Sequence, residues 1–219
     1  MRELSIFPLH TVLFPGTPLP LHIFEPRYRL MIQETLRHDS SFGVALIKRG
    51  VEALGPLPEP YLVGCVANIG QIEYLPDGRM NILAVGEERF RILTLDRSGP
   101  FLKAKVEIIP MEVPQTLSVA REAKHLRPWI TAYLRVLKEI TNESLPLEKL
   151  TLPHDSLPLL YFAASLLQIP LIEKQDLLEA ETSAHLLSKL KRLYRREIAL
   201  LWHLHMFNEA KQAHASRLN

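Results

Sequence analysis

The sequence predicts an α+β protein in which a β-rich amino-terminal half forms a barrel and the carboxyl-terminal half is helical. Up to about residue 110, short apolar runs rich in β-branched residues are separated by Pro and Gly. After Pro114 the apolar residues recur at spacings of three and four, which is the period of a helix. This change of period marks a boundary, so we expect one subdomain at 1–112 and a second at 113–219.

The β-rich half should contain several strands and one inserted helix. The expected strands cover residues 4–8, 19–24, 42–48, 63–74, 80–87, 89–96 and 102–109. The sequence Pro76-Asp77-Gly78 predicts a hairpin turn, because it combines a fixed φ, a capping side chain and a residue that tolerates positive φ. A second turn is expected at Glu87 and Glu88. Pro26 suits the first position of the inserted helix, which should end near His38.

The helical half should begin with an amphipathic helix. Its apolar stripe consists of Ala123, Leu126, Ile130, Tyr133, Leu137 and Ile140. Pro128 lies within this stripe, so a kink or a new helix start is expected there. Further helices are predicted over 156–168, over 170–179 and from Thr182 onward. Residues 208–219 are small and polar and are expected to fray.

Composition limits the partners and the compartment. The chain has 26 basic and 24 acidic residues, and a net charge of +2 does not favour a polyanionic partner. Cys65 is the single cysteine, which excludes an internal disulfide and fits the cytoplasm; its strand-like surroundings predict a buried thiol. No signal-peptide pattern and no apolar run of roughly 20 residues occurs, so no membrane association is expected.

The motifs of several enzyme classes are missing. The sequence contains no G-x-x-x-x-G-K-S/T, G-x-G-x-x-G, G-x-S-x-G or H-E-x-x-H pattern. The stretch His154-Asp155-Ser156 is interpreted as a helix cap rather than a catalytic triad, and the basic stretch KLKRLYRRE at 189–197 as a solvated helix face. We therefore expect no cofactor, no metal site and no catalytic activity.

Six segments of the sequence resemble the amino-terminal domain of Lon proteases. They are LFPG at 13–16, LPLHIFEPRYR at 19–29, FGVAL at 42–46, VGCVANI at 63–69, PDGRMNILAVGEERFRI at 76–92 and LKAKVEII at 102–109. The stretch from 156 to 201 is similar to the end of that domain. The resemblance implies a PUA-like β-barrel with one inserted helix, followed by a carboxyl-terminal helical bundle. Lon proteases continue into ATPase and peptidase modules that this sequence lacks, so a stand-alone, non-catalytic member is expected.

The resemblance also implies a function. It predicts a module that binds unfolded or exposed apolar polypeptide, an adaptor in protein quality control with a separate protease as a further candidate partner. The candidate polypeptide-binding residues are Phe14, Leu19, His22, Glu25, Arg27 and Tyr28. The loop at 55–60 is a candidate rim of the binding surface. RNA binding is the alternative, favoured by the PUA-like fold and the basic residues of the helical half, and an unrecognised hydrolase is a third hypothesis.

The same signature has a structural interpretation. Phe24, Tyr28 and Phe90 are expected in the core, and Gly64, Gly70 and Gly86 at bends of the barrel. Glu25 and Arg27 could pair with Arg89 or Glu88 and hold the barrel closed. Clients and oligomeric state are not predicted.

Overall fold

The computed structural model describes residues 1–112, 122–141 and 151–215, with side chains described up to residue 207. Two compact units are present. The first consists of residues 1–112 together with 164–181, and the second of residues 113–163 together with 182–219. The boundary predicted from the sequence places 164–181 in the helical subdomain, whereas this segment groups with the β-rich residues. The domain boundary itself stays a prediction.

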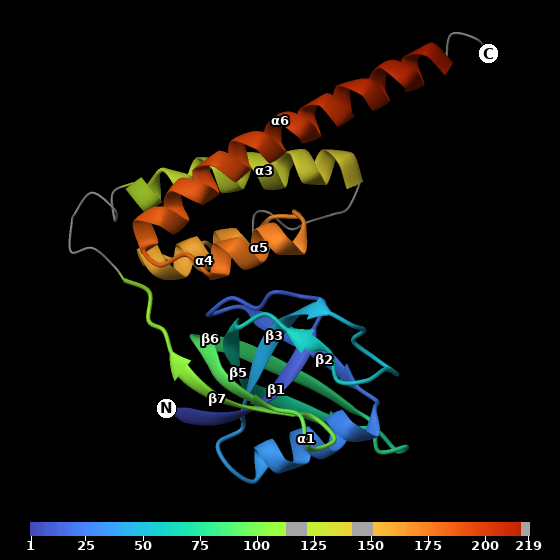
Figure 1. The fold of residues 1–219 in the computed structure, drawn as a ribbon. Helices are drawn as coiled ribbons and strands as arrows, with labels where there is room; N and C mark the ends of the chain where they lie inside the picture. Colours follow the sequence, from blue (N-terminus) through green and yellow to red (C-terminus); the bar gives the residue numbers. More distant parts are fainter. Residues whose placement is uncertain (113–121, 142–150, 216–219) are drawn as a thin grey trace. The chain divides into compact units, whose positions relative to one another are not determined.

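The first unit is built on a mixed sheet (Figure 1). Its strands are β1 (Arg2–Leu9), β2 (Pro18–Ile23), β3 (Ser41–Arg49), β4 (Glu59–Pro60), β5 (Val63–Tyr74), β6 (Met80–Asp96) and β7 (Leu102–Ile108). They pair in the order β1-β7-β6-β5-β3-β4, and β2 joins β6. In addition β1 pairs in parallel with β3, so the path of pairings returns to β1. The short strand β4 was not predicted.

The hairpin between β5 and β6 confirms the predicted turn. Tyr74 pairs with Met80, and the N–H of Leu75 donates to the carbonyl of Arg79 at 2.9 Å. Gly78 has a φ of 79°, which a residue without Cβ adopts at low cost. Asp77 accepts a hydrogen bond from the N–H of Arg79 at 3.0 Å. The turn therefore depends on the same residues from which it was predicted.

The turn expected at Glu87 and Glu88 is wrong. The strand β6 runs through both residues, and their side chains are exposed. Opposite them, Ala67 pairs with Gly86 and Cys65 with Arg89, so β6 carries one more residue than β5 across this interval. The extra residue forms a β-bulge, which bends a strand without ending it.

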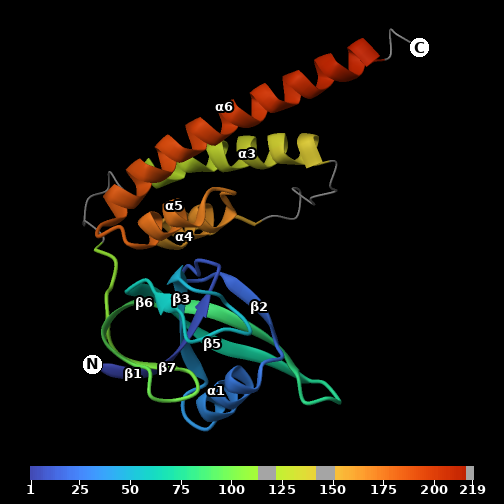
Figure 2. The same ribbon diagram turned by 45° about the vertical axis from the view of Figure 1, so that its right-hand side comes forward.

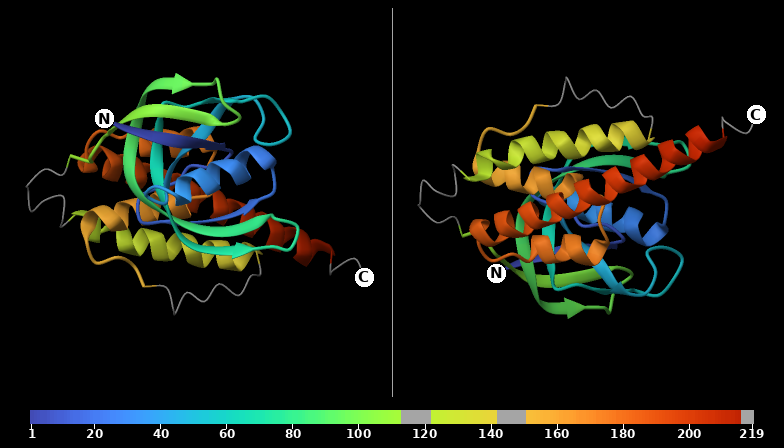
Figure 3. Two further views of the ribbon diagram at one scale, coloured as in Figure 1. Left: turned by 90° about the horizontal axis from the view of Figure 1, so that it is seen from below. Right: turned by 90° about the horizontal axis from the view of Figure 1, so that it is seen from above.

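One helix, α1 (Pro26–Leu36), packs on the sheet (Figure 3, left). Its buried face includes Tyr28, Met31 and Ile32, and the ring of Tyr28 lies 4.3 Å from that of Phe7 between centroids. Tyr28 and Phe90 are buried as expected. Phe24 is 46% exposed, so its expected place in the core is wrong. Because side chains alternate along a strand, burial of Ile23 at the end of β2 turns the next residue outward.

The first unit also contains α5 (Leu171–Leu178). Gln175, which is 1% exposed, donates from its side-chain amide to the carbonyl of Val63 on β5 at 2.9 Å. The guanidinium of Arg89 on β6 donates to the carbonyl of Leu178, the last residue of this helix, and to that of Ala180 just beyond it. These polar contacts connect the sheet to a segment that is distant in the sequence.

The second unit contains α3 (Leu126–Thr141), the larger part of α4 (Ser156–Leu166) and α6 (Ser183–Ala215). A new helix starts at Leu126, just before Pro128, as the sequence predicted. α3 and α6 pack side by side (Figure 2), with the rings of Tyr133 and Tyr194 edge to face at 5.4 Å. The hydroxyl of Tyr194 donates to the carbonyl of Ala163 at 2.9 Å, and burial raises the pKa of this tyrosine.

α6 extends through Ala215, so the expected fraying from residue 208 is wrong up to that point, and residues 216–219 lie outside the described part. The expected helical bundle stays a prediction. Within residues 1–112, 122–141 and 151–215, no helix combines the length and apolar character needed to span a bilayer. The same residues contain no group of three or more His, Cys, Asp or Glu side chains placed to hold a metal ion.

Candidate functional site

A buried ion pair connects the end of β2 and the first turn of α1 to a loop. We call residues 22–27 together with 51–55 the β2–α1 corner. Arg27 Nη2 lies 3.1 Å from Glu25 Oε2, and the two side chains are 14% and 9% exposed. Glu25 also accepts a hydrogen bond from the N–H of Leu54 at 3.2 Å, while Arg27 donates to the carbonyl of Gly55 at 2.9 Å. Both members of the ion pair therefore hold the loop, the carboxylate through an N–H group and the guanidinium through a carbonyl.

The local sequence leaves the Glu25 carboxylate available for this contact. Glu25 is the N-cap of α1 with extended backbone, yet its side chain makes no capping hydrogen bond. Its main-chain carbonyl accepts instead from the N–H groups of Tyr28 and Arg29, at 3.1 and 2.9 Å. Pro26 follows directly and has no N–H to satisfy, as suits a first helical position. The carboxylate can therefore contact the loop without giving up a hydrogen bond that caps the helix.

The loop presents an apolar side chain to solvent in a strained conformation. Leu54 has a φ of 60°, a region that side chains other than Gly rarely occupy, and its side chain is 88% exposed. Val51 in the same loop and Phe24 beside Glu25 are 50% and 46% exposed. Such strain persists where the surrounding contacts over-determine it, often at binding sites.

His22, at the end of β2, belongs to a network of polar side chains. The ring of His22 stacks near Phe24 with centroids 6.1 Å apart. Its Nδ1 lies 2.7 Å from Asn81 Oδ1, and its Nε2 lies 3.3 Å from Arg79 Nη1. Because Oδ1 can only accept and the guanidinium can only donate, both contacts fit a neutral imidazole with its proton on Nδ1. Asn81 in turn donates to Glu73 at 2.8 Å, which fixes the orientation of the amide.

Of the six candidate binding residues, Glu25 and Arg27 contact each other, whereas the contacts of His22 are with Phe24, Asn81 and Arg79. The other three are largely covered. Phe14 is fully buried, Leu19 packs half-buried on the core, and Tyr28 is 3% exposed beneath the Arg27 guanidinium. Burial raises the pKa of Tyr28 to about 12. A role of any of the six in polypeptide binding stays a prediction.

One expectation about this region needs correction. Glu25 and Arg27 pair with each other and with the loop, whereas Arg89 donates to main-chain carbonyls, so the expected pairing across the sheet with Arg89 or Glu88 is wrong. In the expected rim at 55–60, Pro56 is exposed whereas Pro58 and Pro60 are buried, and the place of this segment at a binding surface stays a prediction. Leu54, just before this segment, is 88% exposed. Sequence reasoning missed this residue because a single apolar residue in a loop has no periodic partner that draws attention to it.

Comparison with protein families gives a match over most of the chain. The profile of the ATP-dependent protease La (LON) substrate-binding domain matches residues 3–195. Lon protease 2 of Syntrophobacter fumaroxidans is 30% identical over 191 residues, covering 84% of this chain and 23% of that protein. Lon protease 2 of Herpetosiphon aurantiacus is 30% identical over 205 residues, covering 91% and 24%. The chain thus spans about a quarter of the length of these relatives.

Solved structures share the fold. The Lon N-terminal domain protein from Xanthomonas campestris has a TM-score of 0.64 at 24% identity, covering 88% of this chain and 98% of that one. The N-terminal domain of Mycobacterium avium complex Lon protease has a TM-score of 0.63 at 20% identity, covering 89% and 98%. These comparisons do not support the RNA-binding alternative. With the profile match over residues 3–195, they lead to one conclusion: the chain belongs to the family of Lon substrate-binding domains.

Proposed function

We propose that this chain recognises unfolded or exposed apolar polypeptide and that the β2–α1 corner is part of the binding surface. The observation that carries the proposal is the loop held by Glu25 and Arg27, which presents Leu54 to solvent in a strained conformation. Phe24 and Val51 add exposed apolar area to the same corner. Family membership supports the proposal, because the matched domain is a substrate-binding domain.

The neighbouring strand β2 favours binding through side chains. β2 pairs with β6 and with no other strand in the described part of the chain. Such an edge can accept a further strand from a bound polypeptide. In β2, however, Pro18 and Pro20 have no N–H to donate, and proline on an edge discourages strand addition. We therefore assign recognition to apolar side chains such as Leu54 and Phe24.

Family membership also supports a proposal for the wider role. We propose that the chain has no catalytic activity of its own and acts as an adaptor in protein quality control, with a separate protease as partner. The profile match to a substrate-binding domain supports this role. We further propose that the β1-β7-β6-β5-β3 pairings form the expected small barrel and that α3 and α6 belong to a helical bundle.

The binding proposal can be tested by fluorescence anisotropy with a labelled, permanently unfolded protein such as reduced and carboxymethylated α-lactalbumin. The chain should bind it saturably, and the double substitution Leu54→Asn and Phe24→Ser should weaken binding about tenfold, equivalent to about 1.4 kcal/mol. Asn tolerates positive φ, so the loop should keep its conformation. Absence of saturable binding at tens of micromolar would refute the proposal.

The matched control is Leu93→Ser on β6. Leu93 is 43% exposed, close to the value for Phe24, but lies outside the corner. This variant should bind like the original chain. An equal loss in both variants would show that binding depends on exposed apolar area in general and would contradict the assignment to the corner.

A further inference from the structure

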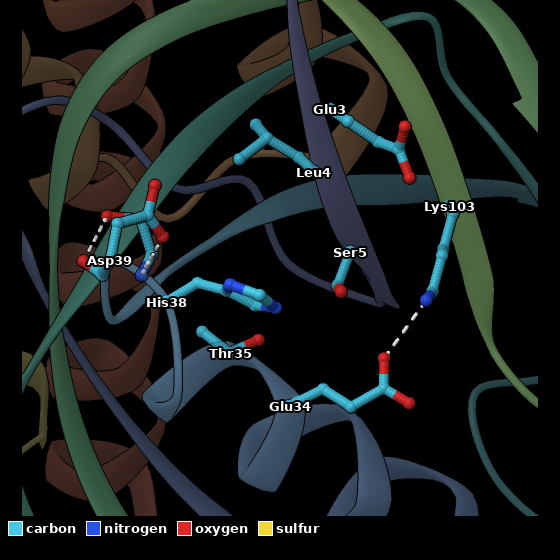
Figure 4. Close-up of a pocket in the computed structure, with 9 residues that line it drawn as sticks. Glu3, Leu4, Ser5, Glu34, Thr35, His38, Asp39 and Lys103 are labelled. Carbon is cyan, nitrogen blue, oxygen red and sulfur yellow. Dashed lines mark hydrogen bonds and ion pairs between the residues drawn. The ribbon is translucent and has the colours of Figure 1, made fainter.

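A polar pocket of about 280 Å³ lies between the carboxyl-terminal end of α1 and the strands β1 and β7 (Figure 4). Its lining residues are Glu3, Leu4, Ser5, Glu34, Thr35, His38, Asp39, Ser41 and Lys103. All of them belong to the first unit. The pocket is formed at the opposite end of α1 from the β2–α1 corner, so its chemistry is separate from the proposed apolar surface.

One polar atom at the bottom of this pocket is unpaired. Thr35 is 4% exposed, and its Oγ1 has no hydrogen-bond partner within the described part of the chain. In Figure 4 this hydroxyl points into the pocket, toward Ser5 and the ring of His38. A buried polar atom without a partner costs stability, whereas an apolar group of the same shape would not. The hydroxyl is therefore an unused hydrogen-bonding group at the wall of the pocket, and an entering group reaches it only when the side chains over it shift.

The charges of the lining determine which kind of group fits. Lys103 Nζ lies 3.0 Å from Glu34 Oε2, and Arg2 pairs with Asp39. Glu3 has no ion pair among the described residues. Partial burial of Asp39 opposes ionisation, but the hydrogen bonds from Arg2 and Ser41 hold the pKa of this carboxyl below its usual range. The lining has the three carboxylates Glu3, Glu34 and Asp39, against the ammonium group of Lys103 and the guanidinium of Arg2 that pairs with Asp39, so the pocket favours a positive group.

We propose that this pocket binds a primary ammonium group, of the kind carried by a lysine side chain. An ammonium group has three donors and no acceptor. The hydroxyl oxygens of Thr35 and Ser5 and the carboxylate of Glu34 can each accept from it, and the unpaired charge of Glu3 adds electrostatic attraction. The same chemistry is present in a lysine of a bound polypeptide and in a free diamine. The lysine source depends on the proposed polypeptide recognition, whereas the free diamine does not.

The test is an amide-shift titration of the ¹⁵N-labelled chain with three probes. Nα-acetyl-lysinamide should shift the amides of Ser5, Thr35 and His38 saturably, with a Kd on the order of millimolar as expected for so few contacts. Nα-acetyl-norleucinamide, which has a similar side chain without the ammonium group, should not. Putrescine identifies the source: stronger binding of the diamine than of acetyl-lysinamide assigns the site to free amines, and the reverse assigns it to lysine.

The decisive variant is Thr35→Val, which removes the hydroxyl and keeps the shape of the side chain. It should weaken the binding of acetyl-lysinamide about threefold to tenfold while the midpoint of thermal unfolding stays the same or rises. The matched control Thr94→Val, at an exposed threonine of β6, should leave binding unchanged. Equal shifts with the norleucine analogue, or unchanged binding by the Thr35 variant, would each overturn the proposal. None of these outcomes depends on the unfolded-protein experiment, so the two proposals can fail separately.

Discussion

Arg89 Nη1 donates hydrogen bonds to the carbonyls of Ala180 at 2.6 Å and of Leu178 at 2.8 Å, across 91 and 89 residues of sequence. Its Nη2 reaches the carbonyl of Pro110 at 3.2 Å. The guanidinium is buried, with 4% of the residue exposed. A rigid fork of donors thus satisfies carbonyls at the end of α5 and at the end of the β-rich segment together. This single side chain joins three stretches of the first unit.

Substitution of Arg89 should therefore destabilise the protein strongly. Arg89→Met keeps the length of the side chain but leaves the carbonyls of Leu178, Ala180 and Pro110 without these donors. We expect a loss of about 2–4 kcal/mol in the free energy of unfolding, measured by urea denaturation. The neighbouring Arg91 is exposed, and Arg91→Met should change stability by no more than about 0.5 kcal/mol. Equal effects of the two substitutions would contradict the role assigned to Arg89.

Two glycines of β5 should respond differently to alanine. A Cβ at Gly64 would lie 2.3 Å from the carbonyl oxygen of Val44 and 2.5 Å from the ring of Phe90. A Cβ at Gly70 would meet nothing closer than the carbonyl oxygen of Leu83 at 3.6 Å. Gly64→Ala should therefore cost about 1–3 kcal/mol in thermal unfolding measurements, while Gly70→Ala should be tolerated. A similar cost at both positions would indicate that strand flexibility, rather than close packing, selects glycine at 64.

The buried thiol of Cys65 should keep its proton in the folded chain at a pH where the unfolded chain loses it. Burial raises its pKa well above the usual range of a thiol, to about 12. Between pH 9 and pH 12 the unfolded chain loses this proton and the folded chain keeps it, so stability falls as pH rises through that interval. Urea denaturation in this range should show a smaller decrease for Cys65→Ala than for the original chain. The burial of Tyr28 acts in the same direction, so a residual decrease in the variant is expected.

The strain at Leu54 predicts opposite effects of two substitutions. Glycine adopts a φ of 60° readily, so Leu54→Gly should keep the stability of the chain or raise it by about 1 kcal/mol. Leu54→Val places a β-branched side chain in the same conformation and should lower stability. Differential scanning calorimetry of the pair measures both effects. If valine is tolerated as well as glycine, the loop is not held in the left-handed region in solution.

Most of the strands and helices could be predicted because their signals are local. The hairpin at Pro76-Asp77-Gly78 and the helix that starts at Pro26 depend on residue types within a few positions. The bulge at Glu87 and Glu88 was mistaken for a turn, because it depends on the register with β5, which is a long-range property.

The candidate site was predicted only in part for the same reason. Glu25 and Arg27 were selected from the signature, but their partner, the loop with Leu54, follows from contacts about 29 residues apart. The pairing of Arg89 with the carbonyl of Ala180 could not be read from sequence either, because a main-chain acceptor leaves no residue-type signature.

The place of segment 164–181 in the first unit has a consequence for how the chain is made. A ribosome synthesises residues 1–112 well before this segment, and domains usually fold as units during synthesis. Until residue 180 has emerged, Arg89 lacks the acceptors Leu178 and Ala180, and Val63 lacks the amide of Gln175. The nascent β-rich portion should therefore stay incompletely stabilised while the intervening residues are added. Ribosome-bound chains arrested so that residue 181 lies inside or outside the exit tunnel should differ sharply in protease resistance.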